Sequence, residues 1–148
     1  GAEIEVLFSH EDYFPGRYAW GNDTSSAFRV TLGGTSIVYL GDCTGALCKQ
    51  MATVFGETLE SDILQVAHHG VGGGDLALYQ YIDPKICLFG TSIGEFTGDR
   101  CNGTGNYTAY DYNAWVRPTD WTRVVNGVEI TGARTHYHGS VRTTIPLK

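Results

Sequence analysis

Two apolar stretches decide the fold, and each ends in residues that can carry chemistry: Ile37-Val38-Tyr39-Leu40-Gly41-Asp42 and Ile63-Leu64-Gln65-Val66-Ala67-His68-His69-Gly70. Continuous apolar runs of this length predict buried strands. A helix-like stretch lies between them, so the chain predicts a strand–helix–strand unit with parallel strands. In open α/β sheets, ligands bind at the carboxyl ends of such strands. We therefore expect Asp42 and the histidine pair to meet at one edge of a sheet and to form a metal site.

The rest of the chain extends this unit. Alternating or continuous apolar residues predict strands at 4–8, 28–32, 36–40, 62–67 and 86–90. A helix is expected between an N-cap at Thr44 and a stop at Gly56, with a shorter helix between Asp75 and Pro84. Residues 91–106 are expected to form a long loop, followed by a helix at 108–116 and β-like stretches at 124–130 and 137–145. This order of elements predicts the α/β class.

Composition excludes several classes of protein. The 148 residues carry a net charge of −6 with a pI of about 5.2, and no cluster of lysine or arginine suggests a nucleic-acid surface. No apolar run reaches the ~20 residues of a membrane span, and no signal-peptide pattern opens the given sequence. The four cysteines form no CxxC pair, which favours a reducing, cytoplasmic location. An upstream signal would make the protein extracellular instead.

Smaller features are assigned structural roles. Cys87 lies within an apolar strand and is expected to act as a small buried hydrophobe, whereas Cys43 follows Asp42 directly and is a weaker candidate for the site. The glycines at 72–74 predict a flexible loop rather than a phosphate cradle, because no GK[ST] follows them. Asn22, Ser25 and Ser26 are expected to organise the turn into the strand at 28–32. The aromatic cluster at 107–121 is expected to belong to a core.

The residue types at the two strand ends suit divalent metals. The carboxylate of Asp42 can bridge two cations, and His69 or His68 can give an imidazole nitrogen to one of them. Two metals about 3.5–4 Å apart lower the pKa of a shared water and produce hydroxide at neutral pH. That chemistry hydrolyses phosphate esters, lactones or amides.

The other histidines do not complete such a site by sequence alone. Catalytic zinc needs at least three protein ligands, yet the five histidines contain no HxHxDH run. His136 and His138 have HxH spacing, which points both rings to one face of a strand. A metal role for this pair and a location in a surface hairpin around His138-Gly139 both stay open, and the hairpin is favoured.

The chain resembles a known family on a longer set of residues. They are Asn22-Asp23-Thr24-Ser25-Ser26, Phe28-Arg29-Val30, Gly34, Ile37 to Asp42, Ser61 to Gly70, Asp83-Pro84-Lys85 and the closing strand Val141 to Leu147. This pattern is similar to the C-terminal half of a metallo-β-lactamase-fold hydrolase. The nearest branch includes metal-dependent domains of competence-type DNA-uptake proteins and bacterial phosphorylcholine esterases. The resemblance covers roughly residues 4–92 well and the tail loosely.

The resemblance implies a fold, a reaction and site residues. The fold would be half of an αββα sandwich, with a mixed sheet and flanking helices. Asp42 would be the bridging aspartate, His69 the favoured metal ligand, and His68 either the ligand or a substrate-facing catalytic group. The cofactor would be two zinc or manganese ions, which would hydrolyse a phosphodiester or related ester by a metal-bound hydroxide.

The family's HxHxDH motif lies in its N-terminal half, and nothing in this chain matches it. We therefore expect residues 1–148 to form one domain, the C-terminal part of a longer protein, with Gly1 consistent with a tag remnant. Such a piece would bind metal weakly and be inactive alone.

Two other interpretations remain open. The first is a non-catalytic binding or structural module of the same fold that lacks a metal site. The second is a self-assembling piece that restores a missing surface by dimerising. The expected partners are the missing N-terminal half and a second copy of the chain, because half a sandwich would expose an apolar sheet face. A small-molecule or phosphodiester substrate is the remaining expected partner.

Overall fold

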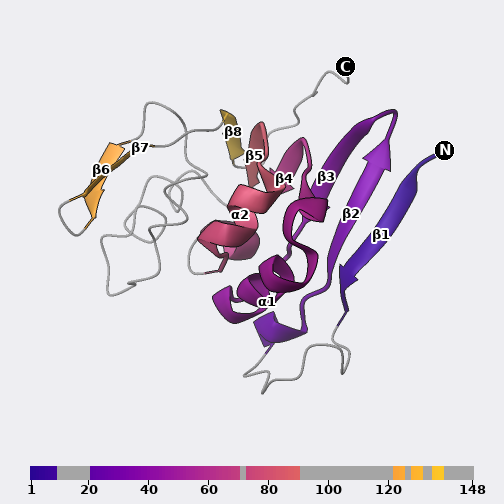
Figure 1. Ribbon diagram of the computed structural model, residues 1–148, viewed down its shortest axis with the longest axis horizontal. Helices are drawn as coiled ribbons and strands as arrows, with labels where there is room; N and C mark the ends of the chain where they lie inside the picture. The colour runs from indigo at the N-terminus through magenta and orange to yellow at the C-terminus, as the bar shows by residue number, and fades with distance from the viewer. Residues whose placement is uncertain (10–20, 71–72, 91–121, 126–127, 132–134, 139–148) are drawn as a thin grey trace.

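The computed structural model describes residues 1–9, 21–70, 73–90, 122–125, 128–131 and 135–138 (Figure 1). The strands are β1 Glu3–Phe8, β2 Ala27–Leu32, β3 Thr35–Tyr39, β4 Ile63–Gln65, β5 Ile86–Phe89, β6 Thr122–Val125, β7 Val128–Thr131 and β8 Thr135–His138. The helices are α1 Gly45–Phe55 and α2 Leu76–Ile82, with 3₁₀ turns η1 Gly21–Thr24, η2 Gly56–Leu59 and η3 Ala67–Gly70.

The main sheet is mixed and has the order β1-β2-β3-β4-β5-β8. β1, β2 and β3 pair antiparallel, whereas β3, β4, β5 and β8 run parallel. β6 and β7 form a separate hairpin, as the stretch at 124–130 predicted. The α/β class and the parallel pairing of the two deciding strands are therefore confirmed.

The helices begin and end where the sequence places them. Thr44 is the N-cap of α1, although its side chain makes no capping hydrogen bond. Gly56 ends this helix with a φ of 51°, a conformation that favours glycine. Asp75 caps α2 by accepting a hydrogen bond from the backbone nitrogen of Leu78 at 3.1 Å, and Asp83 closes the helix in the left-handed region.

The core lies between the helices and one face of the sheet (Figure 1). Val38, Leu64 and Cys87 are register neighbours on β3, β4 and β5, and all three are fully buried. They pack in one cluster with Leu47 and Met51 of α1 and with apolar residues of α2. Cys87 is thus the small buried hydrophobe that the sequence predicted.

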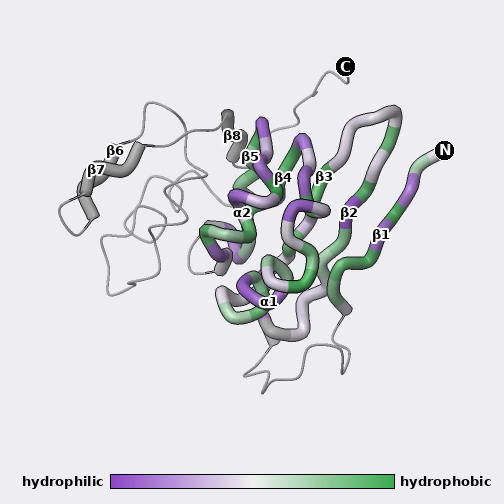
Figure 2. Tube along the Cα trace, in the orientation of Figure 1, coloured by the Kyte–Doolittle hydropathy of each residue, from purple (hydrophilic) through white to green (hydrophobic). Residues whose placement is uncertain are grey.

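The opposite face of the sheet is also apolar. One row across the strands consists of Ile4, Val30, Ile37, Ile63 and Ile86. The next row on this face consists of Val6, Phe28, Tyr39, Gln65 and Leu88. Figure 2 shows the alternation of hydrophobic and hydrophilic residues along β1 that produces the two faces. In the described part of the chain, both helices cover the other face.

Exposure on this apolar face is uneven. Ile4 and Val6 on β1 are 68% and 63% exposed, whereas Ile63 on β4 is 6% exposed. The uncovered part therefore lies towards the β1 edge.

Two predicted elements differ from the structure. β4 ends at Gln65 rather than at residue 67, because the chain turns into η3 there. The second C-terminal stretch begins at Thr135 instead of residue 137, and it pairs parallel with β5. The expected loop at 91–106, helix at 108–116 and aromatic cluster at 107–121 lie outside the described residues. Within the described ranges, no helix is both long and apolar enough to cross a bilayer.

Candidate metal site at the strand ends

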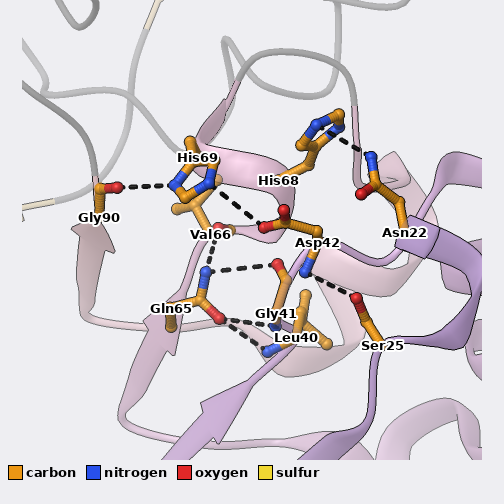
Figure 3. Close-up of polar contacts among 10 residues, drawn as sticks. All are labelled: Asn22, Ser25, Leu40, Gly41, Asp42, Gln65, Val66, His68, His69 and Gly90. Atoms are coloured by element: carbon orange, nitrogen blue, oxygen red, sulfur yellow. Dashed lines mark hydrogen bonds and ion pairs between the residues drawn. The ribbon is translucent and has the colours of Figure 1, made fainter.

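The carboxyl ends of β3, β4 and β5 bring three groups together (Figure 3). Asp42 follows β3, the histidines lie in η3 after β4, and Gly90 follows β5. The Nε2 atom of His69 lies 3.4 Å from Oδ1 of Asp42, and both side chains are partly exposed. The expected meeting of an aspartate with one of the histidines at this edge is therefore present.

The ring of His69 is oriented by the end of β5. Its Nδ1 atom lies 2.6 Å from the carbonyl oxygen of Gly90. A carbonyl can only accept a hydrogen bond, so Nδ1 carries a proton and donates it. In the neutral tautomer, Nε2 then presents a lone pair to the Asp42 carboxylate, which is also an acceptor. A cation between the two groups would stabilise this arrangement.

This arrangement is the one that metal-binding histidines usually have. In metal sites, a ligating imidazole donates its other ring N–H to a carboxylate or a backbone carbonyl, which fixes its tautomer. Gly90 supplies that carbonyl to His69, whose Nε2 atom faces the Asp42 carboxylate.

The Asp42 carboxylate has little else to bind it. Its backbone nitrogen donates to Oγ of Ser25 at 3.2 Å, which fixes the main chain after β3. Among the described residues, the only partner of its carboxylate is His69, at a separation longer than the usual 2.7–3.2 Å of an N–H···O hydrogen bond. Lone pairs on both oxygens therefore remain for a cation.

His68 lies apart from this pair. Its Nε2 atom is 3.2 Å from Nδ2 of Asn22, and Figure 3 shows the ring on the side of Asn22. An amide nitrogen can only donate, so Nε2 of His68 accepts and its Nδ1 carries the proton. The two imidazole rings are 6.2 Å apart and tilted by 53°. The geometry therefore favours His69 over His68 as the ligand beside Asp42.

The backbone separates the two rings. His68 has φ 46° and ψ 47°, His69 has φ 58° and ψ 7°, and Gly70 follows with φ 80°. Each non-glycine residue in the left-handed region costs roughly 1–2 kcal/mol. Strain of this kind concentrates at functional sites, where the surrounding structure holds it in place. The sequence prediction of a strand to residue 67 gave no indication of this turn.

Close packing holds the strained turn. A Cβ atom on Gly73 would overlap the carbonyl oxygen of Cys43 and lie 2.6 Å from Cβ of His68. A Cβ atom on Gly70 would lie 2.8 Å from the ring of Phe89. The flexible loop predicted at 72–74 is therefore wrong for Gly73, which is packed against the site.

The nearby thiols are buried in the core. Cys43 and Cys48 are 0% exposed, and Sγ of Cys48 is directed to the carbonyl oxygen of Cys43 at 3.8 Å. Burial raises the pKa of the Cys48 thiol well above its ordinary value, and the neighbouring Cys43 raises it further. Cys48 is therefore a neutral packing group and not a thiolate ligand.

Two described side chains at this site, those of Asp42 and His69, carry atoms that can bind a metal. Within the described ranges, no group of three or more His, Cys, Asp or Glu side chains is placed to hold a metal. In β8, His136 pairs with Cys87 and His138 with Phe89, so His138 ends a strand at the same edge as Gly90. β8 is three strand positions from β3, about 14 Å at normal spacing. In the sheet, β4 and β5 separate the backbone of β8 from β3, and His10 lies outside the described residues.

Sequence reasoning missed three contributors to this site. Gly90 acts through its backbone carbonyl, for which no side-chain signal exists. Asn22 was expected only to organise a turn, although it also contacts His68. Gln65 carried a usable signal, because it is the one polar residue between Ile63 and Ala67 in an otherwise apolar run.

No protein-family model matches this sequence, and a comparison with curated proteins finds no significant match. The likeness to metallo-β-lactamase-fold hydrolases therefore depends on the residues and spacings quoted above.

Proposed function

We propose that this chain supplies Asp42 and His69 to the divalent-metal site of a hydrolase with a metallo-β-lactamase-like fold. The observation that carries the proposal is the orientation of His69, whose Nδ1 is bound by Gly90 while Nε2 faces a carboxylate oxygen at 3.4 Å. A carboxylate oxygen and an imidazole nitrogen suit zinc or manganese. The substrate class is a phosphodiester or related ester, by analogy with the family that the sequence resembles.

The chain's own residues divide the work. Asp42 and His69 bind the cation, and the remaining ligands come from the upstream half of a longer protein. A bound divalent cation supplies Lewis acidity and activates water at neutral pH. His68 holds the amide of Asn22 through Nε2, so its Nδ1–H is the group that can face a substrate. It is the candidate for proton transfer to or from the reacting ester.

The direct test is to measure whether the chain binds a divalent metal weakly at Asp42 and His69. Paramagnetic Mn²⁺ broadens the NMR signals of nuclei close to the ion even when its affinity is low. We expect Mn²⁺ to broaden the signals of Asp42 and His69 first, and Asp42→Ala and His69→Ala to abolish this effect. His68→Ala should retain it. Asp62→Ala, which removes a carboxylate at the opposite end of β4, is the matched control and should also retain it.

A non-catalytic module of the same fold is the competing function. It is favoured by the presence of only two donors among the described side chains of this edge. Mn²⁺ broadening that is absent from Asp42 and His69, or unchanged in Asp42→Ala, would select this module and reject the hydrolase.

We also propose that a second copy covers the apolar sheet face when the chain is separated from the upstream half. The two rows on that face contain no charged residue from β1 to β5, so a second copy meets no like charge there although each chain carries −6. Ile4, Val6 and Leu32 are between 52% and 68% exposed. An exposed apolar surface of this kind usually marks an interface.

Light scattering tests the proposed dimer. We expect the wild-type chain to be dimeric and Ile4→Lys or Val6→Lys to make it monomeric. Val54→Lys is the matched control, because Val54 is 48% exposed but belongs to α1 on the other side of the sheet. A monomeric wild-type chain at concentrations near 1 mM, on the order of weak specific interfaces, contradicts the proposal.

A further inference from the structure

The hydrogen-bond ladder between β3 and β4 changes character at its carboxyl end. The last register pair is Tyr39 with Gln65. Beyond it, the backbone nitrogens of Leu40 and Gly41 donate to Oε1 of Gln65 at 3.0 and 2.8 Å (Figure 3). The side-chain amide thus takes the place of the backbone carbonyls that would continue the ladder.

The Gln65 amide also donates to the residue that follows it in the chain. Nε2 of Gln65 donates to the carbonyl oxygen of Val66 at 2.6 Å, with a longer contact of 3.5 Å to the carbonyl of Gly41. One side chain therefore satisfies two backbone donors that follow β3 and one acceptor that follows β4. Leaving a buried backbone donor without a partner costs about 1–3 kcal/mol, so this position strongly favours a side chain with both an acceptor and a donor.

Gly41 connects the Gln65 amide with the metal-binding pair. Its nitrogen binds Gln65, and its carbonyl oxygen accepts from the backbone nitrogen of His68 at 2.9 Å. Gly41 has φ 54° and precedes Asp42 directly, while His68 precedes His69. The nitrogen and the carbonyl oxygen of Gly41 are thereby both held by hydrogen bonds. The separation of Asp42 and His69 therefore depends on where Gln65 holds Gly41.

We propose that Gln65 is a positioning residue that sets the distance between Asp42 and His69. This inference rests on the proposed metal site, but the contacts of Gln65 with Leu40 and Gly41 are independent of any metal. Gln65 does not lie among the donors themselves and acts through the backbone of Gly41.

The test compares Gln65→Met with Ser36→Ala. Methionine has a similar length and removes the amide, whereas Ser36→Ala removes the hydroxyl that accepts from the Asp62 nitrogen at 3.2 Å, at the other end of the same strands. In Gln65→Met, we expect the affinity for Mn²⁺ at Asp42 and His69 to fall about 10–100-fold, the usual effect of losing an outer partner. Ser36→Ala should keep the wild-type affinity. Circular dichroism of both variants checks that they fold.

Amide hydrogen exchange provides a readout without metal. The amides of Leu40 and Gly41 should exchange about 10-fold or more faster in Gln65→Met and at the wild-type rate in Ser36→Ala. Wild-type exchange at both amides, or wild-type Mn²⁺ affinity in Gln65→Met, overturns the role of Gln65. An unchanged affinity in Asp42→Ala overturns the metal site instead, and the exchange rates then still decide whether Gln65 holds the strand end.

Discussion

The two ends of the β3–β4 pair each carry an aspartate, and the two carboxylates have opposite surroundings. At the amino end of β4, Asp62 accepts from Nζ of Lys85 at 2.7 Å and from the backbone nitrogen of Ser36 at 3.0 Å. Its backbone carbonyl also accepts from the nitrogens of Lys85 and Ile86. At the carboxyl end of β3, the Asp42 carboxylate faces only His69 among the described residues, at 3.4 Å.

This difference is the one we expect between a carboxylate that stabilises the sheet and one that binds a ligand. Each carboxylate oxygen of Asp62 lies within hydrogen-bonding distance of a donor, so its charge contributes to the stability of the sheet. Asp42 lies among residues with positive φ and lacks a close donor, so its charge contributes nothing comparable to stability. A strained turn around an unsatisfied carboxylate is what a binding site requires and what a stable sheet edge avoids.

The largest expected effect that separates the two ends is on stability. Asp62→Ala should lower the free energy of unfolding by about 1–3 kcal/mol, because it removes hydrogen bonds to a charged group. Asp42→Ala should change the unfolding free energy by less than about 0.5 kcal/mol, as at ordinary surface positions. Urea unfolding followed by circular dichroism measures both values. Equal losses in the two variants would show that the contrast between the carboxylates has no energetic meaning.

A smaller effect should reveal the strain in the histidine turn. His69→Gly should be more stable than His69→Ala by about 0.5–1 kcal/mol, because glycine adopts a φ of 58° without the steric cost of a Cβ atom. Thermal unfolding of the two variants measures this difference.

The control lies on α1, where the order should reverse. Lys49 is an exposed helical residue, so Lys49→Gly should be less stable than Lys49→Ala by about 1 kcal/mol. If alanine is the more stable residue at both positions, the turn at His69 is not strained.

Much of the fold follows from the sequence, because the deciding strands are buried on at least one face. Continuous apolar runs identified β3, β4 and β5, and the N-cap at Thr44 with the stop at Gly56 identified α1. The parallel connection then placed Asp42 and His69 at one edge, since the carboxyl ends of neighbouring parallel strands meet. These are consequences of hydrophobic burial and chain connectivity, which a pattern of residue types records.

The details of the site could not be predicted in the same way. The left-handed turn at His68 and His69 contradicts local preference. It is held by tertiary contacts, among them the packing of Gly73 and hydrogen bonds to Gly41 and Gly90. The choice of His69 over His68 depends on a backbone carbonyl at Gly90, which every residue type possesses. β8 was missed as a parallel partner of β5 because residues 90–134 separate the two strands, and those at 91–106 show little periodicity.

The two anchors of β4 fix the length of the chain between them. Asp62 is tied to Ser36 at one end, and the His68 nitrogen is tied to Gly41 at the other. One inserted or deleted residue between 63 and 67 would break one of these ties and would turn Leu64 out of the core while bringing Gln65 into it. Evolution can therefore exchange side chains in this segment far more readily than it can tolerate a gap there.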